Sequence, residues 1–241
     1  MCSGCDFQRY VLSRGCAKTN EADTLRIIEA EILGDNAEVK RRFLNHFNKE
    51  LNDFIKAISE AYDRWRLFDV DLRNDEGRAH ISSMIFSVIN NHIISMKLLV
   101  SGYIIAAGTA ERLVLEYIAM AFLSSQPRLE YLKRYMDEKY STKNAVRDVL
   151  REHKKLGLDK EALDILRTSR NFFHKYNHPT LLTMALQTSM STKGKIYIGA
   201  SFDEGKLEYY KKEVRSRLSL ASTFCNFIDS ICMNLNRPSQ H

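Results

Sequence analysis

The chain has 241 residues, 44% of them hydrophobic, which is enough for one sizeable core or at most two small ones. Only three prolines and ten glycines interrupt it, a composition that favours long helices over many short strands. The formal net charge of +6 suits an acidic partner such as RNA, DNA or a nucleotide. The odd number of cysteines, five, argues against a disulfide-scaffolded secreted protein and for reduced thiols in a cytosol.

The first 18 residues are expected to form a flexible leader, because they lack the apolar stretch of a signal peptide. Cys2, Cys5 and Cys16 supply only three of the four ligands that a closed zinc site needs, so we interpret them as leader thiols rather than metal ligands. One helical domain is expected over residues 19–237.

Two long uncharged runs, 81–96 and 98–110, are the most apolar parts of the chain. The first contains Asn90, Asn91 and His92, and neither run is long enough to cross a bilayer. We therefore expect both to be buried in protein, His92 to be a core histidine with a satisfied ring, and the chain to be cytoplasmic with no membrane partner.

Apolar residues recur at three- and four-residue steps through most of the chain, which is the period of an amphipathic helix. The sequence predicts an all-α fold, a multi-helix bundle with at most a short β-hairpin near 183–202. The two most apolar helices should form an antiparallel hairpin at its centre, with a turn at Ser101-Gly102. We expect helices at about 20–34, 36–67, 76–100, 103–124, 127–139, 141–157, 159–178 and 204–237.

The segment from Arg167 to Pro179 carries the clearest candidate for chemistry. On a continuous α-helix, one stripe roughly 60° wide holds four of its polar residues. Histidine can transfer protons near neutral pH, arginine can fork onto phosphate oxygens, and asparagine can hold either in place. The alternative is an ordinary solvated face, although such faces are usually built from Lys and Glu. The stripe consists of Arg167, Asn171, His174 and His178, with Arg170 and Asn177 beside it.

Short motifs in this region resemble those of HEPN domains, which are small all-α bundles. Six residues lie between Arg167 and His174, which fits the Arg-x4–6-His signature of that superfamily. The stretch 106–116 is similar to an Arg-x3-Glu helix of uncharacterised bacterial HEPN-like families, in which a later helix ends in His-Pro. The resemblance covers about residues 80–235 and depends on short motifs.

The resemblance implies a metal-independent endoribonuclease of the toxin or phage-defence (antiviral) type, with no cofactor. Its Arg and His residues would form paired sites across a homodimer, where the RNA 2′-hydroxyl attacks the adjacent phosphate. The sequence departs from the signature in one respect: Thr168, and not the usual polar residue, follows Arg167. The implied catalytic candidates are Arg167, Arg170, Asn171, His174 and His178, and the implied supporting residues are Arg112, Glu116 and Asn177.

Three alternatives remain open from the residues themselves. Arg112 and Glu116, four residues apart, could form only a structural ion pair along their helix. The chain could be a non-catalytic module that binds a protein partner or a nucleotide through the basic face of helix 36–67. His174 and His178 could also share a metal ion, although no carboxylate at an adjacent helical step completes such a site.

Overall fold

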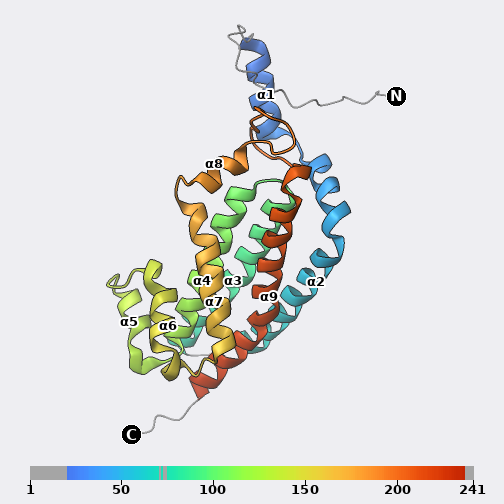
Figure 1. Cartoon of the computed structure of the whole chain (residues 1–241). Helices are drawn as coiled ribbons and strands as arrows, with labels where there is room; N and C mark the ends of the chain where they lie inside the picture. The colour runs from blue at the N-terminus through green and yellow to red at the C-terminus, as the bar shows by residue number, and fades with distance from the viewer. Residues whose placement is uncertain (1–20, 71, 73–74, 237–241) are drawn as a thin grey trace.

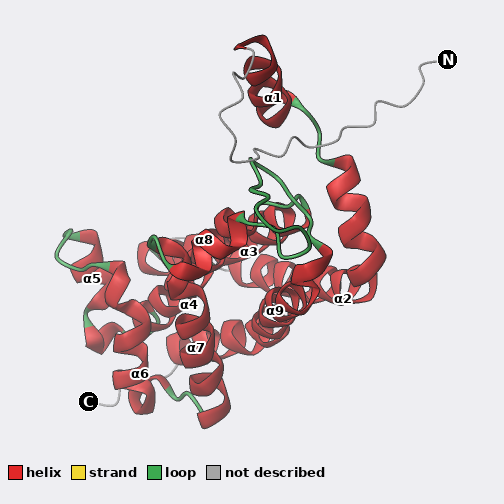
Figure 2. Ribbon diagram, turned by 45° about the horizontal axis from the view of Figure 1, so that its top comes forward, coloured by secondary structure: helices red, strands yellow, loops and turns green. Residues whose placement is uncertain are grey.

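The structure is a computed structural model that describes residues 21–70, 72 and 75–236. All of its regular elements are helical, so the predicted all-α class is confirmed (Figure 2). In chain order the elements are α1 (Glu21–Leu33), α2 (Ala37–Val70), α3 (Glu76–Val100), α4 (Ile104–Ser124), η1 (Pro127–Leu129), α5 (Tyr131–Met136), η2 (Thr142–Asn144), α6 (Ala145–Leu156), α7 (Lys160–Phe173), η3 (His174–Asn177), α8 (Leu181–Gln187), η4 (Glu204–Lys206) and α9 (Leu207–Asn236), where η denotes a 3-10 helix.

The α3–α4 hairpin forms the centre of the bundle, as the apolar periodicity predicts (Figure 1). Its turn is tight because Gly102 has a positive φ of 86°, a conformation that side chains with a Cβ rarely adopt. A Cβ at Gly102 would also lie 2.6 Å from the backbone nitrogen of Ser201. The turn therefore needs glycine both for its conformation and for the close approach of the loop above it.

Two long helices, α2 and α9, cover one side of this hairpin (Figure 1). The apolar residues of α2 recur every three or four positions and are buried, from Val39 to Ala61. Non-helical backbone angles at Phe47 bend α2, which lets one helix follow the curved side of the bundle. Near its end, Arg64 forms an ion pair with Asp229 of α9.

The α5, α6 and α7 helices pack on the other side of α4 (Figure 1). Asp159 caps α7 as predicted, since its carboxylate accepts a hydrogen bond of 2.8 Å from the backbone nitrogen of Ala162. Gly157 ends α6 with a positive φ of 70°. The helix expected at 127–139 is instead divided, because Glu130 adopts a left-handed conformation between η1 and α5.

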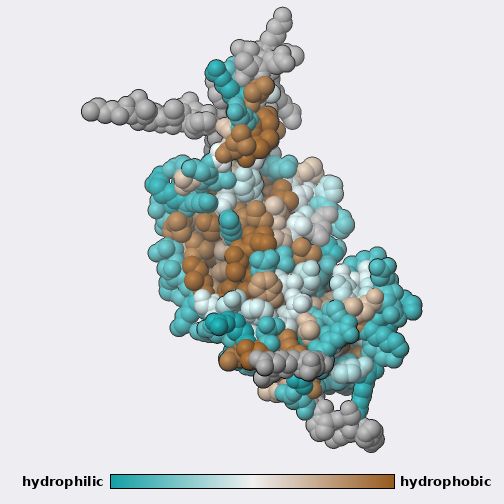
Figure 3. Space-filling model, turned by 180° about the vertical axis from the view of Figure 1, so that it is seen from behind, coloured by the Kyte–Doolittle hydropathy of each residue, from teal (hydrophilic) through white to brown (hydrophobic). Residues whose placement is uncertain are grey.

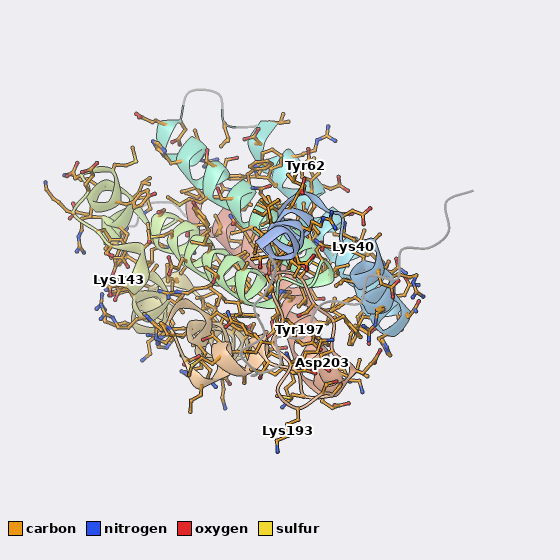
Figure 4. The ribbon with its side chains drawn as sticks, turned by 90° about the horizontal axis from the view of Figure 1, so that it is seen from above. Lys40, Tyr62, Lys143, Lys193, Tyr197 and Asp203 are labelled. Carbon is orange, nitrogen blue, oxygen red and sulfur yellow. The ribbon has the colours of Figure 1, made fainter. Side chains whose placement is uncertain are left out.

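The region near 183–202, where the sequence allows at most a short β-hairpin, forms no strand among the described residues. Helix α8 occupies the start of this region, and the extended pairing is limited to one isolated bridge between Thr188 and Ile196. The buried carboxylate of Asp203 organises the loop by accepting hydrogen bonds from Met190 N at 2.6 Å and Gly205 N at 3.1 Å. These satisfied backbone groups replace a strand ladder, and Figure 4 shows Tyr197 and Asp203 close together with Lys193 extending outward.

Helix α1 extends away from the bundle at the start of α2 (Figure 1). The predicted leader, with Cys2, Cys5 and Cys16, lies outside the described residues. Within them, α3 is long and apolar enough to cross a membrane by length and composition, a test that core helices of soluble proteins also pass. Almost half of its most apolar window, 44%, is buried against the other helices.

Candidate functional site

The predicted polar stripe does not lie on one continuous helix. Helix α7 ends at Phe173, and the next four residues form the 3-10 helix η3. His178 is extended, with φ −133° and ψ 152°, because the ring of Pro179 disfavours α-helical angles in the residue before it. The expected helix over 159–178 was therefore wrong for its last turn, and a helical spacing of four does not place His178 beside His174.

The two histidines are nevertheless neighbours, because the chain turns at this point. Their ring centroids lie 5.5 Å apart in an edge-to-face arrangement. The Thr180 side chain caps α8 and also donates a hydrogen bond of 3.2 Å to the carbonyl of Lys175. A second hydroxyl, that of Thr183, donates to the carbonyl of His178 at 3.4 Å. These bonds hold the two ends of the turn, and with them both imidazoles.

Helix α4 brings a second set of charges to the same place. Arg112 Nε lies 3.0 Å from Glu116 Oε1, so the predicted pairing of these residues is confirmed. The other Glu116 oxygen accepts a hydrogen bond of 3.4 Å from Thr142. Arg112 is close enough to His174 to affect its ionisation, although 62 residues separate them in the sequence. We call the set Arg112, Glu116, Arg170, His174 and His178 the exposed Arg–His cluster.

The ionisation of His174 reflects this environment. Partial desolvation of the ring lowers its pKa from the ordinary 6.5, and the positive charges of Arg112 and Arg170 and the neighbouring His178 lower it further. A lowered pKa keeps the imidazole neutral at pH 7, and a neutral imidazole can accept a proton. The two arginines provide the positive charge that a phosphate would need at the same position.

Three of the predicted site residues are not brought into this cluster by any contact among the described residues. Arg167 forms an ion pair of 2.8 Å with Asp164, one turn earlier on α7, and both side chains are about half exposed. Asn171 is exposed on α7. Asn177 lies in η3, and its side chain is outside the described set.

A buried network lies directly beneath the cluster and was not predicted. Its members are His92, Glu111, Tyr176, Glu213 and Arg217, contributed by α3, α4, η3 and α9, and all are at most 3% exposed. His92 is buried as expected, but the expected satisfied ring was wrong: its Nδ1 lies 3.1 Å from Glu111 Oε1, and neither ring nitrogen forms a hydrogen bond with the described residues. The network thus joins four separate helical elements through side chains in the core.

Arg217 is the centre of this buried network. Its Nη1 lies 2.5 Å from Glu213 Oε2, and its Nε donates to Ser95 Oγ at 2.8 Å and lies 3.8 Å from Glu111 Oε2. Burial opposes its charge, yet Glu213 and Glu111 raise the pKa of Arg217 above its ordinary value. Burial also opposes the charge of Glu111, but His92 and Arg217 hold the Glu111 pKa below 4.5.

Tyr176 connects the buried network to the exposed Arg–His cluster, because it lies in η3 between the two histidines. Its hydroxyl donates to Glu213 and is 2.5 Å from the hydroxyl of Tyr209. Its ring packs on α4 at Gly108, where a Cβ would come within 2.3 Å of the ring. The backbone that carries His174 and His178 is therefore fixed from below.

The sequence contained a signal for this network. Glu213 and Arg217 are four residues apart on α9 and fall in phase with the buried Tyr210 and Phe224. Charged residues at core positions of an amphipathic helix imply buried partners, because an unpaired charge in the core is very costly. The periodicity showed that partners were needed, but it gave no means of finding Glu111 and Tyr176.

The described residues contain no group of three His, Cys, Asp or Glu side chains arranged to hold a metal ion. A metal shared by His174 and His178 thus has no third protein ligand among them. In comparisons with protein-family models, curated proteins and solved structures, the chain matched none.

Proposed function

We propose that the chain is a HEPN-like protein that acts on RNA in the cytoplasm as a metal-independent endoribonuclease of the toxin or phage-defence type. The observation that carries this proposal is the meeting of two imidazoles with Arg112 and Arg170 at one exposed position. The second support is the resemblance of the Arg112–Glu116 helix and the His178-Pro179 ending to HEPN-like sequences, since Arg167 of the Arg-x4–6-His motif is paired with Asp164 instead. The net charge of +6 favours the same polyanionic partner.

The chemistry would use only side chains of the cluster. His174, whose pKa is lowered, would take the proton from a ribose 2′-hydroxyl, and the 2′-oxygen would attack the adjacent phosphorus. The bond to the 5′-oxygen would break as that oxygen receives a proton from His178, leaving a cyclic 2′,3′-phosphate and a 5′-hydroxyl. Arg112 and Arg170 would hold the phosphate oxygens as negative charge develops.

The proposal includes a homodimer, since a single cluster offers at most half of a HEPN-type cleft. Closed two-fold symmetry is the commonest way to pair identical surfaces. Leu113 follows Arg112 on α4, and its apolar side chain is exposed. A dimer interface at this position would bury it.

Cleavage of a mixed RNA pool tests the proposal. Wild type should cut with and without EDTA, while His174→Ala and His178→Ala should fold normally and lose cutting by about 10² or more. Arg112→Lys should also impair cutting, because an ammonium cannot replace a bidentate fork on phosphate. Arg167→Lys is the matched control on the same surface, since Arg167 is paired with Asp164 away from the histidines.

Two outcomes would replace this proposal. Cutting that disappears only with EDTA would indicate a metal enzyme. Binding of RNA, a nucleotide or a protein without any cutting would favour the non-catalytic module. The basic face of α2 is a weaker candidate for such binding than the sequence suggests, because Arg41, Arg42 and Lys49 are already paired with Glu38, Glu204 and Asp53.

A further inference from the structure

Helix α1 presents an apolar stripe that the rest of the chain does not cover. Leu25, Ile28 and Ile32 recur at three- and four-residue steps, and their side chains are 44–72% exposed. The other side of α1 faces the body of the protein, where Glu31 accepts a hydrogen bond of 3.2 Å from the backbone nitrogen of Ala200. An isolated helix of 13 residues is marginal in water, so this stripe needs a packing partner.

A second apolar surface lies on the bundle itself. We call it the α2–α3–α4 face, and its large side chains are 39–61% exposed. The ring of Trp65 links two of the helices, since it lies 5.4 Å from Tyr62 and 4.9 Å from Phe86. Figure 3 shows the hydrophobic side chains of α1 and those of the bundle on the same side of the molecule. The members of the α2–α3–α4 face are Ile55, Tyr62, Phe86, Ile93, Ile94 and Leu113.

The two surfaces match in spacing. Leu25 and Ile32 are seven residues apart on α1, as Phe86 and Ile93 are on α3, so two stripes of equal length could pack along each other.

The exposed apolar area is large enough for a stable association. The nine side chains of the two surfaces expose on the order of 900 Å², against about 800 Å² that each partner contributes to a standard interface. Exposed apolar patches of this size on a single chain mark interaction sites. Because one chain carries both apolar surfaces, a second copy supplies a packing partner for each.

We propose that a second copy of this chain covers both surfaces, with α1 of each copy packed on the α2–α3–α4 face of the other. Such a reciprocal exchange closes with two-fold symmetry and buries both patches at once. This exchange specifies the interface of the homodimer in the proposed function, and it does not depend on the RNA chemistry. The face also adjoins the exposed Arg–His cluster, because Leu113 and Arg112 are consecutive on α4.

Light scattering of the full chain at tens of micromolar tests the association, in the range of a weak to moderate complex. Wild type should be a dimer, and Ile32→Glu and Ile93→Glu should each be monomers with unchanged helical circular dichroism. Leu67→Glu is the matched control: Leu67 is at least as exposed as these residues but is turned about 120° around α2 from Ile55, and this variant should remain a dimer.

A mixture of two tagged chains tests the exchange itself. One carries Ile32→Cys and the other Ile93→Cys, both with the native cysteines replaced, and a short bis-maleimide should join the two tags. Three results would overturn the proposal: a wild-type monomer, whether or not it binds anionic lipid vesicles; a dimer that survives either charge variant; or no cross-link between the two tags. A wild-type monomer that still cuts RNA would overturn the exchange and leave the RNA activity standing.

Discussion

The buried network and the exposed Arg–His cluster contain the same residue types but differ in what surrounds them. In the buried network both carboxylates lie within 4 Å of Arg217, so removing Arg217 leaves uncompensated negative charge in the core. In the exposed cluster Arg112 pairs with Glu116 and both are partly buried, while Arg170, His174 and His178 are exposed beside them. The difference indicates that the first set holds the fold together, while the second presents side chains that a ligand can reach.

The comparison predicts its largest effect at Arg217. Arg217→Met removes the cation that touches both Glu213 and Glu111, and it should lower the free energy of unfolding by about 3–5 kcal/mol. Arg170→Met in the exposed cluster should change it by less than about 0.5 kcal/mol. Urea denaturation of both variants measures the contrast, and equal effects would remove the distinction between the two regions.

The contact between Gly108 and Tyr176, where the two regions meet, should give the next largest effect on the free energy of unfolding. Gly108→Ala would place a methyl group 2.3 Å from the Tyr176 ring and should cost about 1–3 kcal/mol through overpacking. It should also shift the NMR signals of His174 and His178, because Tyr176 lies between them. Gly77→Ala, whose nearest contact would be 3.3 Å, should stay within about 1 kcal/mol of wild type. An unperturbed His174 in a destabilised Gly108→Ala protein would separate the two regions.

Acid should weaken the buried network at a lower pH than the exposed cluster, and by a larger amount. The folded-state pKa of Glu111 is below 4.5, so its contribution is fully present above that pH and is lost as pH falls through the folded value. Asp203, whose pKa is also lowered, by Ser191 and two backbone donors despite its burial, adds in the same direction. Unfolding measured from pH 7 to pH 3 should show this loss, with a shallower slope in Glu111→Gln.

The smallest effect on stability should be the titration of His174. NMR titration should give a pKa below 6.5, and Arg112→Gln should move it upward, whereas Arg167→Gln should leave it unchanged. Because the folded-state pKa is lowered, the associated stability is present above pH 6.5 and declines slightly as the pH falls. An unchanged His174 pKa in Arg112→Gln would place Arg112 outside the cluster.

The sequence by itself determined the long helices and some of their ends, because these depend on local periodicity and on single residues. The α3–α4 hairpin, the Asp159 cap and the end of α6 at Gly157 all follow from neighbours a few positions apart. It also indicated the pairing of Arg112 with Glu116, because residues four apart on a helix share a face.

Only the tertiary structure decided which faces meet. Periodicity shows that a residue points inward, but not which of the other helices it faces, so the approach of Arg112 to His174 and of Glu111 to Arg217 could not be predicted. The end of α7 at Phe173 had a local cause in Pro179, yet the 5.5 Å approach of His178 to His174 arises from the packing of η3 on α4. Burial made the final distinction: the same Glu, Arg and His chemistry holds the fold where water is excluded and is available for binding where it is not.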